Sequence, residues 1–250
     1  MAKKEAVLLL WTGGWDSTFR LLQLLHDTDA DVQPLYLVDE GRGSTPREIE
    51  TMRSIRERIG HRWPEMSNRL RATGYGSYRA TRMKARHREQ WEALKQRGRV
   101  GLQYPILASY ADHNDMDRME LSIVATGGGI QDILEPVVEQ RDTPAGPVYA
   151  LPSSVDGPEA LFRHFTFPLL NYTKLDMKGE AKRRGWMPIM KQTQFCFNPT
   201  LGRPCGVCHP CRTARREGLG ERVGYVGPLM FWVLHPRMLA GKVIRKLDLR

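Results

Sequence analysis

The segment Ala6–Phe19, with the sequence AVLLLWTGGWDSTF, constrains the fold of this chain more than any other. An apolar run at Ala6–Leu10 is followed by Gly13 and Gly14, and apolar residues then recur at helical spacing up to Leu25. This order predicts a buried strand, a tight turn and the beginning of a helix. The amide groups and dipole at the start of a helix attract anions, and glycine lets phosphate approach the main chain. We therefore predict a phosphate-binding loop at this turn.

The type of loop follows from the residues around the glycines. No Lys follows them, so the Walker pattern is absent, and so is Gly-x-Gly-x-x-Gly. The stretch Thr12–Thr18 resembles the Ser-Gly-Gly-x-Asp-Ser signature of PP-loop ATP pyrophosphatases, with Thr12 supplying the hydroxyl in place of Ser. The alternative is an ordinary strand-to-helix turn capped by Asp16 or Ser17.

Length and composition are those of a globular protein. The chain has 250 residues, of which 41% are hydrophobic and 26% charged, so one or two domains with a sizeable core are expected. Met1–Lys4 leads straight into the first strand without a signal-peptide layout, and the longest apolar stretches, near Leu8 and Phe231, are too short to span a bilayer. We therefore expect a cytoplasmic protein without a membrane segment.

The formal net charge of +10 favours an anionic partner such as a nucleotide, a nucleic acid or an acidic protein surface. Arg82–Arg99 holds seven Lys and Arg residues against two Glu, and Arg212–Arg250 holds nine against three acidic residues. A solvated basic face is the plainer interpretation of each cluster. Nucleic acid is therefore a partner that the charge permits but does not favour.

The next elements predict the fold class. Val32–Val38 has the pattern of a second strand ending at Asp39, and a helix with Thr45 as N-cap is expected to run to about Ile59. Alternating strands and helices predict an α/β fold with a doubly wound, parallel, Rossmann-like sheet. Ligands bind such sheets at the carboxyl ends of the strands, which is where the Gly13 loop and Asp39 both fall.

The middle of the chain has weaker patterns. We expect loops at Gly74–Gly76 and, around a short strand, at Asp142–Pro158. Three glycines after the strand at residues 121–125 indicate either close approach of a ligand or a flexible loop. The further expected elements are helices at Arg82–Gln96 and Ile106–Asp112, strands at Leu121–Ala125 and Arg163–Leu170, and a helix from Thr173 to Arg184.

All four cysteines lie in one Cys-x8-Cys-x2-Cys-x2-Cys stretch, formed by Cys196, Cys205, Cys208 and Cys211. Thiolates suit tetrahedral zinc, and four of them complete its shell, so the metal should be structural. Two disulfides are the alternative, which the close spacing and an expected cytosolic location oppose. An iron–sulfur cluster is chemically allowed. His209 is a candidate ligand that the four cysteines make unnecessary.

The glycine loop and the cysteine stretch together resemble the 7-cyano-7-deazaguanine synthases, a family of the PP-loop superfamily. Val38–Gly41 corresponds to the Phe-Asp-Tyr-Gly of that family, Phe167–Lys174 to its Pro-Leu-x-x-Leu-Ser-Lys and Gln194–Phe197 to its Ser-Cys-Tyr. The resemblance covers both ends of the chain and not the middle, as in a divergent member.

The resemblance implies the cofactors ATP and Mg²⁺, a structural Zn²⁺ and a small deazaguanine substrate. The carboxylate of 7-carboxy-7-deazaguanine attacks the α-phosphorus of ATP, giving an acyl-adenylate and pyrophosphate. Ammonia then displaces AMP to give an amide, and a second ATP drives its dehydration to a nitrile. The candidate catalytic residues are Asp16, Ser17 and the base Lys174, for which a solvated helix-start lysine is the alternative. The residues implied to bind ATP are Trp11, Thr12, Gly13, Gly14, Trp15, Asp16, Ser17 and Thr18 at the phosphates, and Leu37 and Asp39 near the adenosine.

Three departures from the family fall at the acceptor end. Arg42–Ser44 replaces Gln-Arg-His, Gln103–Ile106 stands in place of Val-Pro-x-Arg-Asn, and Gly127–Asp132 replaces the longer Asp-Tyr-Ser-Gly-Tyr-Pro-Asp-Cys-Arg stretch. We infer retained adenylation chemistry with an altered acceptor or pocket. An amine on a protein would then be an acceptor in place of ammonia.

Two domains are expected, a nucleotide-binding domain at residues 1–190 and a zinc knuckle with a helical tail at 191–250. The apolar stretch Gly224–Leu234 and the basic Arg237–Arg250 predict a helix packed on the first domain, or a surface for a partner or a second subunit. Two other functions stay open. One is a PP-loop enzyme that modifies tRNA, and the other is a non-catalytic zinc-knuckle module that binds nucleic acid.

Overall fold

The computed structural model describes residues 6–125 and 129–234. The chain divides into two compact units, Met1–Gln194 and Phe195–Arg250. The division follows Gln194, where the sequence analysis places it after residue 190. The expected basic tail at residues 237–250 lies outside the described residues.

The first unit is built on one sheet. Within the described residues it has seven strands in the order β3-β2-β1-β4-β7-β6-β5. The pairs from β3 to β7 are parallel, and β6 and β5 add antiparallel strands at one edge. This confirms an α/β fold with a mostly parallel sheet, compatible with a Rossmann-like fold. The strands are β1 (Val7–Leu10), β2 (Val32–Val38), β3 (Gly74–Ser77), β4 (Met119–Glu120), β5 (Glu139–Thr143), β6 (Gly146–Ala150) and β7 (Phe165–Phe167).

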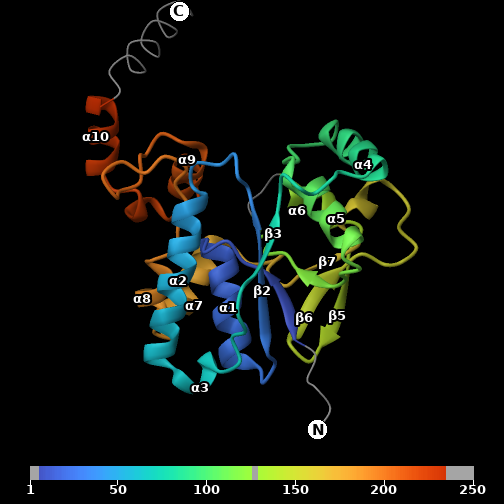
Figure 1. The fold of residues 1–250 in the computed structure, drawn as a ribbon, viewed down its shortest axis with the longest axis horizontal. Coiled ribbons are helices and arrows are strands. Elements are labelled where there is room, and N and C mark those ends of the chain that lie inside the picture. Colours follow the sequence, from blue (N-terminus) through green and yellow to red (C-terminus); the bar gives the residue numbers. More distant parts are fainter. Residues whose placement is uncertain (1–5, 126–128, 235–250) are drawn as a thin grey trace, which may run out of the picture. The chain divides into compact units, whose positions relative to one another are not determined.

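Helices cover both faces of this sheet. Figure 1 shows α1, α2 and α7 on one side of the strands and α4, α5 and α6 on the other. Because both faces are covered, much of the central strands is buried and apolar, including Leu9 and Leu10 of β1. The helices of this unit are α1 (Trp15–Asp27), α2 (Thr45–Arg62), α3 (Pro64–Ser67), α4 (Ala85–Lys95), α5 (Gln103–His113), α6 (Ile130–Leu134), the 3₁₀ turn η1 (Pro158–Phe162), α7 (Lys174–Arg183) and α8 (Met187–Met190).

The beginning of α2 differs from the prediction. Thr45 is the first residue of the helix, and Ser44 occupies the N-cap position. The Thr45 hydroxyl donates to the carbonyl of Asp39 at 2.7 Å, and the Ser44 hydroxyl donates to the Glu48 carboxylate at 2.7 Å. Assigning the N-cap to Thr45 was therefore wrong, because its hydroxyl ties the helix to the end of β2 instead.

The loop expected at Gly74–Gly76 is part of strand β3, which pairs in parallel with β2. A side chain at Gly76 would meet the ring of Tyr110, since a Cβ there would lie 2.6 Å from it. Glycine is needed at this position because an α5 side chain lies against the strand. The glycines of this stretch favour a loop when only the sequence is considered, but in the structure Gly76 allows the Tyr110 ring to pack closely against β3.

The next part of the sheet also corrects two predictions. The strand expected at Leu121–Ala125 is instead the short β4, and residues 121–125 lie beyond its end, where the Leu121 N–H still donates to the Thr166 carbonyl of β7 at 2.9 Å. The loop expected at 142–158 contains β6, which matches the short strand expected there, whereas its antiparallel partner β5, which begins at Glu139, was not expected. The three-glycine stretch lies outside the described residues except for Gly129.

The second unit contains α9 (His209–Arg216), the 3₁₀ turn η2 (Gly220–Arg222) and α10 (Val226–Leu234). Helix α10 buries Phe231 and leaves Leu229 and Val233 exposed. Apart from cysteines, the buried apolar side chains in the described part of this unit are Ala214, Leu219, Val223 and Phe231.

Candidate functional site

A cavity of about 590 Å³ lies in the first unit at the carboxyl ends of the parallel strands. Its walls come from the ends of β1, β2 and β4 and from the beginning of α5. This is the position where open α/β sheets bind their ligands. The predicted ATP-binding residues that line the cavity are Trp11, Thr12, Gly14, Asp16, Ser17, Leu37 and Asp39.

The remaining predicted loop residues support the loop from behind. Gly13, Trp15 and Thr18 are buried, and the Trp11 indole N–H donates to Thr18 Oγ1 at 3.0 Å. Gly13 has a φ of 68°, and a Cβ on it would lie 3.2 Å from the side chain of Met52. Glycine is therefore needed here both for the left-handed backbone and for the close approach of α2.

The beginning of α1 offers main-chain donors to a ligand. Gly14 is its N-cap residue, and among the described residues no side chain caps the helix. Neither Asp16 nor Ser17 caps the helix, although the Ser17 hydroxyl accepts the backbone N–H of Thr12 within the turn at 3.5 Å. Because the first amides of a helix have no intrahelical partners, this turn is suited to an anion in the cavity.

Lys174 and Asp16 come together although they are far apart in the sequence. The Lys174 ammonium forms an ion pair with the Asp16 carboxylate beside the cavity. Lys174 is the first residue of α7, and a capping box between Thr173 and Asp176 holds that end of the helix. The structure thus places a cation at the glycine loop.

Residues that the sequence analysis missed form another wall of the cavity. Tyr36, Arg42 and Tyr78 line it beside Asp39. The Tyr36 hydroxyl donates to the Glu48 carboxylate at 2.8 Å, and burial raises the pKa of Tyr36 above its ordinary value. An Arg42 nitrogen lies 3.7 Å from the same carboxylate. In the sequence, the departure from the family pattern at residues 42–44 was the one observation that pointed to a different wall at this place.

The third wall is mostly apolar. Leu102 and Leu107 from the α5 region and Leu121 after β4 contribute to it, together with Ser122. Among the described residues, the buried Ser122 hydroxyl oxygen has no hydrogen-bond partner. An apolar wall with one unsatisfied hydroxyl suits a flat ligand that carries polar atoms on its edge.

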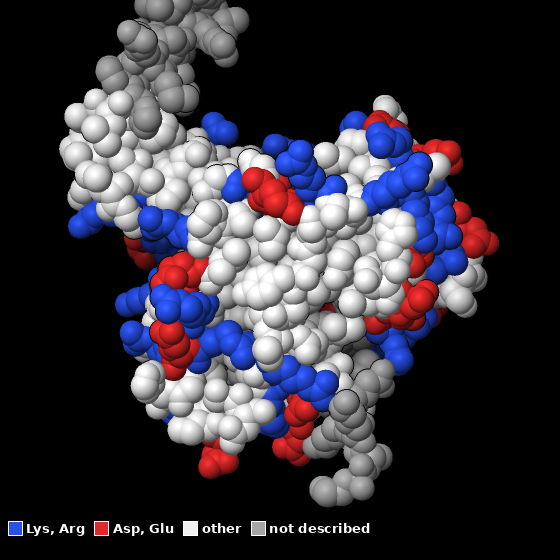
Figure 2. Space-filling model, viewed as in Figure 1, with Lys and Arg blue, Asp and Glu red and all other residues white. Residues whose placement is uncertain are grey.

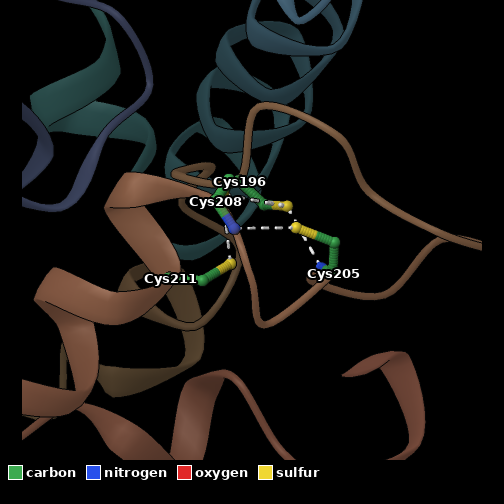
Figure 3. Close-up of side chains that lie close together, drawn as sticks. All are labelled: Cys196, Cys205, Cys208 and Cys211. Atoms are coloured by element: carbon green, nitrogen blue, oxygen red, sulfur yellow. Dashed lines mark hydrogen bonds between the residues drawn. The ribbon is translucent and has the colours of Figure 1, made fainter. Parts of the chain in front are cut away.

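The four cysteines meet in the second unit. Figure 3 shows their side chains pointing toward one another. The Cys208 sulfur lies 3.4 Å from that of Cys211 and 3.9 Å from that of Cys196. Zn–S bonds of about 2.3 Å in a tetrahedron place the sulfurs about 3.8 Å apart. The four sulfurs, each within 4.8 Å of the others, therefore fit a structural zinc ion.

The electrostatics of the cluster also fit a cation. Interaction with the Cys208 sulfur raises the pKa of Cys196 to about 12, whereas interactions with the Cys196 and Cys211 sulfurs hold the pKa of Cys208 well below its ordinary value. The backbone N–H of Cys205 donates to the Cys196 sulfur at 3.2 Å. Close thiols thus share their protons, and a divalent metal would replace those protons.

The surface is basic over α4. Figure 2 shows Lys and Arg side chains gathered there, and Arg86, Arg88 and Lys95 are exposed on this helix. Lys95 pairs with Glu92, so part of this charge is compensated locally. Among the helices that the structure describes, none has the length and apolar character needed to cross a membrane.

Comparisons with known proteins leave the site to be interpreted from its own geometry. No protein-family model matches the chain, and no curated protein matches it significantly.

Proposed function

We propose that this protein is an ATP-dependent enzyme that activates a carboxylate by forming an acyl-adenylate. One observation carries the proposal. The uncapped beginning of α1 faces a cavity at the carboxyl ends of the strands, and the pair of Asp16 and Lys174 lies beside that loop. Main-chain donors, a carboxylate and a cation at one glycine turn are the groups that nucleotide phosphates require.

Each group has a separate role in this reaction. The amides after Gly14 would bind phosphate oxygens, and Lys174 would balance the negative charge that grows on them. Asp16 is the carboxylate that would hold Mg²⁺, whose charge neutralises the triphosphate. The substrate carboxylate attacks the α-phosphorus, and the bond from that phosphorus to the leaving pyrophosphate breaks.

The substrate that we propose is 7-carboxy-7-deazaguanine, in line with the resemblance to 7-cyano-7-deazaguanine synthases. A flat, polar-edged base suits the wall formed by Leu102, Leu107 and Ser122. The acyl group would pass to an amine, either ammonia or an amine on a protein. In this proposal the cysteine site holds a structural zinc ion and takes no part in the chemistry.

The test is pyrophosphate release from ATP after addition of 7-carboxy-7-deazaguanine. We expect release by the wild type and a loss of about 100-fold or more in the Asp16→Ala variant. The matched control is Asp156→Ala, because the Asp156 side chain is 89% exposed. Circular dichroism should show that both variants fold.

The outcomes separate the competing functions. Release with tRNA and not with the deazaguanine would favour a tRNA-modifying enzyme. No release with either substrate would favour a non-catalytic binding module. Mass spectrometry of the products, with ammonium or a candidate protein acceptor present, would identify the amine from a nitrile, an amide or a protein adduct.

A further inference from the structure

A second cluster of metal-binding side chains lies in the first unit, away from the cavity. It consists of His87 at the beginning of α4, Asp112 in the last turn of α5 and His164 immediately before β7. Since His164 precedes a strand of the parallel part of the sheet, the cluster lies at the amino ends of the strands, opposite the cavity. None of the three belongs to the described lining of the cavity.

The donor atoms of the cluster lie close enough together to share one metal ion. His87 Nε2 lies 3.3 Å from Asp112 Oδ2, and His164 Nε2 lies 3.1 Å from Asp112 Oδ1. Metal–ligand bonds of about 2.0–2.1 Å in a tetrahedron place neighbouring ligand atoms about 3.3 Å apart. One donor atom from each residue lies within 4.8 Å of the others.

The hydrogen bonds of Ser109 determine which nitrogen of His87 carries the proton. The Ser109 hydroxyl donates to the carbonyl of Pro105 at 2.7 Å and accepts the backbone N–H of Lys84 at 3.0 Å. Its remaining lone pair faces His87 Nδ1 at 2.9 Å, so Nδ1 must donate to it. In the neutral ring Nε2 then carries the lone pair with which histidine binds metals.

The lone pair of His87 Nε2 points to a carboxylate, which is unfavourable unless a positive charge lies nearby. The Arg86 Nε donates weakly to Nε2 at 3.4 Å, and Arg86 and Lys84 both pair with Asp112. The Arg86 side chain is 60% exposed, so it can move into solvent when a stronger electrophile binds.

We propose that His87, Asp112 and His164 form a second metal site, which takes a divalent first-row ion of the zinc class. Two neutral imidazoles and one carboxylate are the donor set that such ions prefer. The carboxyl end of α5 adds the negative end of a helix dipole beside the ion. Three protein ligands leave one position for water, unlike the closed shell of the four cysteines. The proposal does not depend on the proposed ATP chemistry.

The experiment is a metal titration of the full chain after removal of bound metal. We expect the wild type to bind two equivalents of Zn²⁺, and His164→Gln and Cys208→Ser to bind one each. His113→Gln is the matched control and should bind two, because His113 lies beside Asp112 on α5 and outside the cluster. Elemental analysis of the dialysed proteins gives the stoichiometry.

Cobalt distinguishes the two sites spectroscopically. In the Cys208→Ser background, bound Co²⁺ should give the visible bands of nitrogen and oxygen ligands and lose most of the thiolate charge-transfer absorption. One equivalent of metal in the wild type, or two in His164→Gln, would overturn the proposal. The number of metal equivalents bound by the wild type can by itself contradict the proposal. The test therefore remains valid even if a variant fails to fold.

Discussion

At the scale of single residues, Gly13 decides whether the glycine loop can form. Its φ of 68° is left-handed, and the side chains of Met52 and Thr51 approach within 3.2 Å of where a Cβ would stand. Any other residue would have to move α2 away from the loop. Gly43 is a useful contrast, since within the described part of the chain no atom lies within 4 Å of a Cβ added there.

We predict that Gly13→Ala destabilises the protein by about 1–2 kcal/mol or more, because alanine in a left-handed conformation costs that much before any clash is counted. Gly43→Ala should stay within about 0.5 kcal/mol of the wild type. Urea denaturation measures both. Equal stability of the two variants would show that the loop relaxes around an added side chain.

A buried ion pair joins α1 to β4. The Arg20 guanidinium donates to both Glu120 oxygens at 2.8 and 2.7 Å and to the carbonyl of Ala145 at 3.0 Å. Both charged side chains are less than 10% exposed. Because both side chains are buried, removing either one leaves the other charge buried and unpaired, and this destabilises the folded protein.

We predict that Glu120→Leu destabilises the protein by roughly 3–5 kcal/mol, since it leaves the Arg20 charge buried and unpaired. The double variant Arg20→Met with Glu120→Leu should be less destabilised than the single one, because it buries no isolated charge. Chemical denaturation of the wild type and the variants gives the coupling energy. A double variant that loses the sum of the two single effects would argue against this interpretation.

At the scale of elements, the beginning of α7 positions Lys174. The Thr173 hydroxyl accepts the Asp176 N–H at 3.1 Å, and the Asp176 carboxylate accepts the Thr173 N–H at 2.9 Å. The Thr173 hydroxyl also donates to the Asp176 carboxylate at 2.6 Å, and this bond and the one from the Thr173 N–H hold the pKa of Asp176 below its ordinary value of 3.8. The sequence analysis predicted a helix start at Thr173, and the structure has Thr173 as the N-cap residue of α7.

We predict that Thr173→Ala lowers stability by about 1 kcal/mol at neutral pH, whereas Thr173→Ser keeps most of it. The pKa of Asp176 is lower in the folded chain than in the unfolded chain. The ionised Asp176 carboxylate therefore gives its full stabilisation of the fold above the ordinary pKa, and this stabilisation is lost as the pH falls through the pKa of the folded chain. The gap between wild type and Thr173→Ala should therefore narrow below pH 3.8. Urea melts at several pH values test this, and a gap independent of pH would contradict it.

At the scale of the whole molecule, the two units differ in what holds them together. The first unit has a broad apolar core around its sheet. In the described part of the second unit the buried apolar side chains are few, among them Leu219, Val223 and Phe231, and a metal held by the cysteines would add to the stability that they provide.

We predict that chelation, or Cys208→Ser, removes zinc and makes the segment from Phe195 sensitive to protease, while the first unit keeps its thermal transition. His209→Ala should retain zinc, because four cysteines complete the shell. Limited proteolysis followed by mass spectrometry identifies the segment that opens. A protease-resistant, metal-free Cys208→Ser protein would show that the cysteine site is not structural.

Local signals were enough to predict the elements with strong patterns. The strand β1, the helix α1 and the cysteine cluster each follow from a residue pattern or spacing that lies within a short stretch of sequence. Strands β3 and β5 lacked such signals. The first contains two glycines, and the second is the polar and fully exposed EQRDT, which forms a strand because β6 pairs with it.

The sequence by itself determined the α/β class, the glycine loop and the ligand set of the candidate zinc site, because these follow from local spacing and side-chain chemistry. The tertiary structure alone decided which distant side chains meet. It brought Lys174 to Asp16 across 158 residues and joined His87, Asp112 and His164. Such contacts between distant residues depend on strand order and helix placement. These are determined by the burial of apolar area over the whole chain, so no short stretch of sequence predicts them.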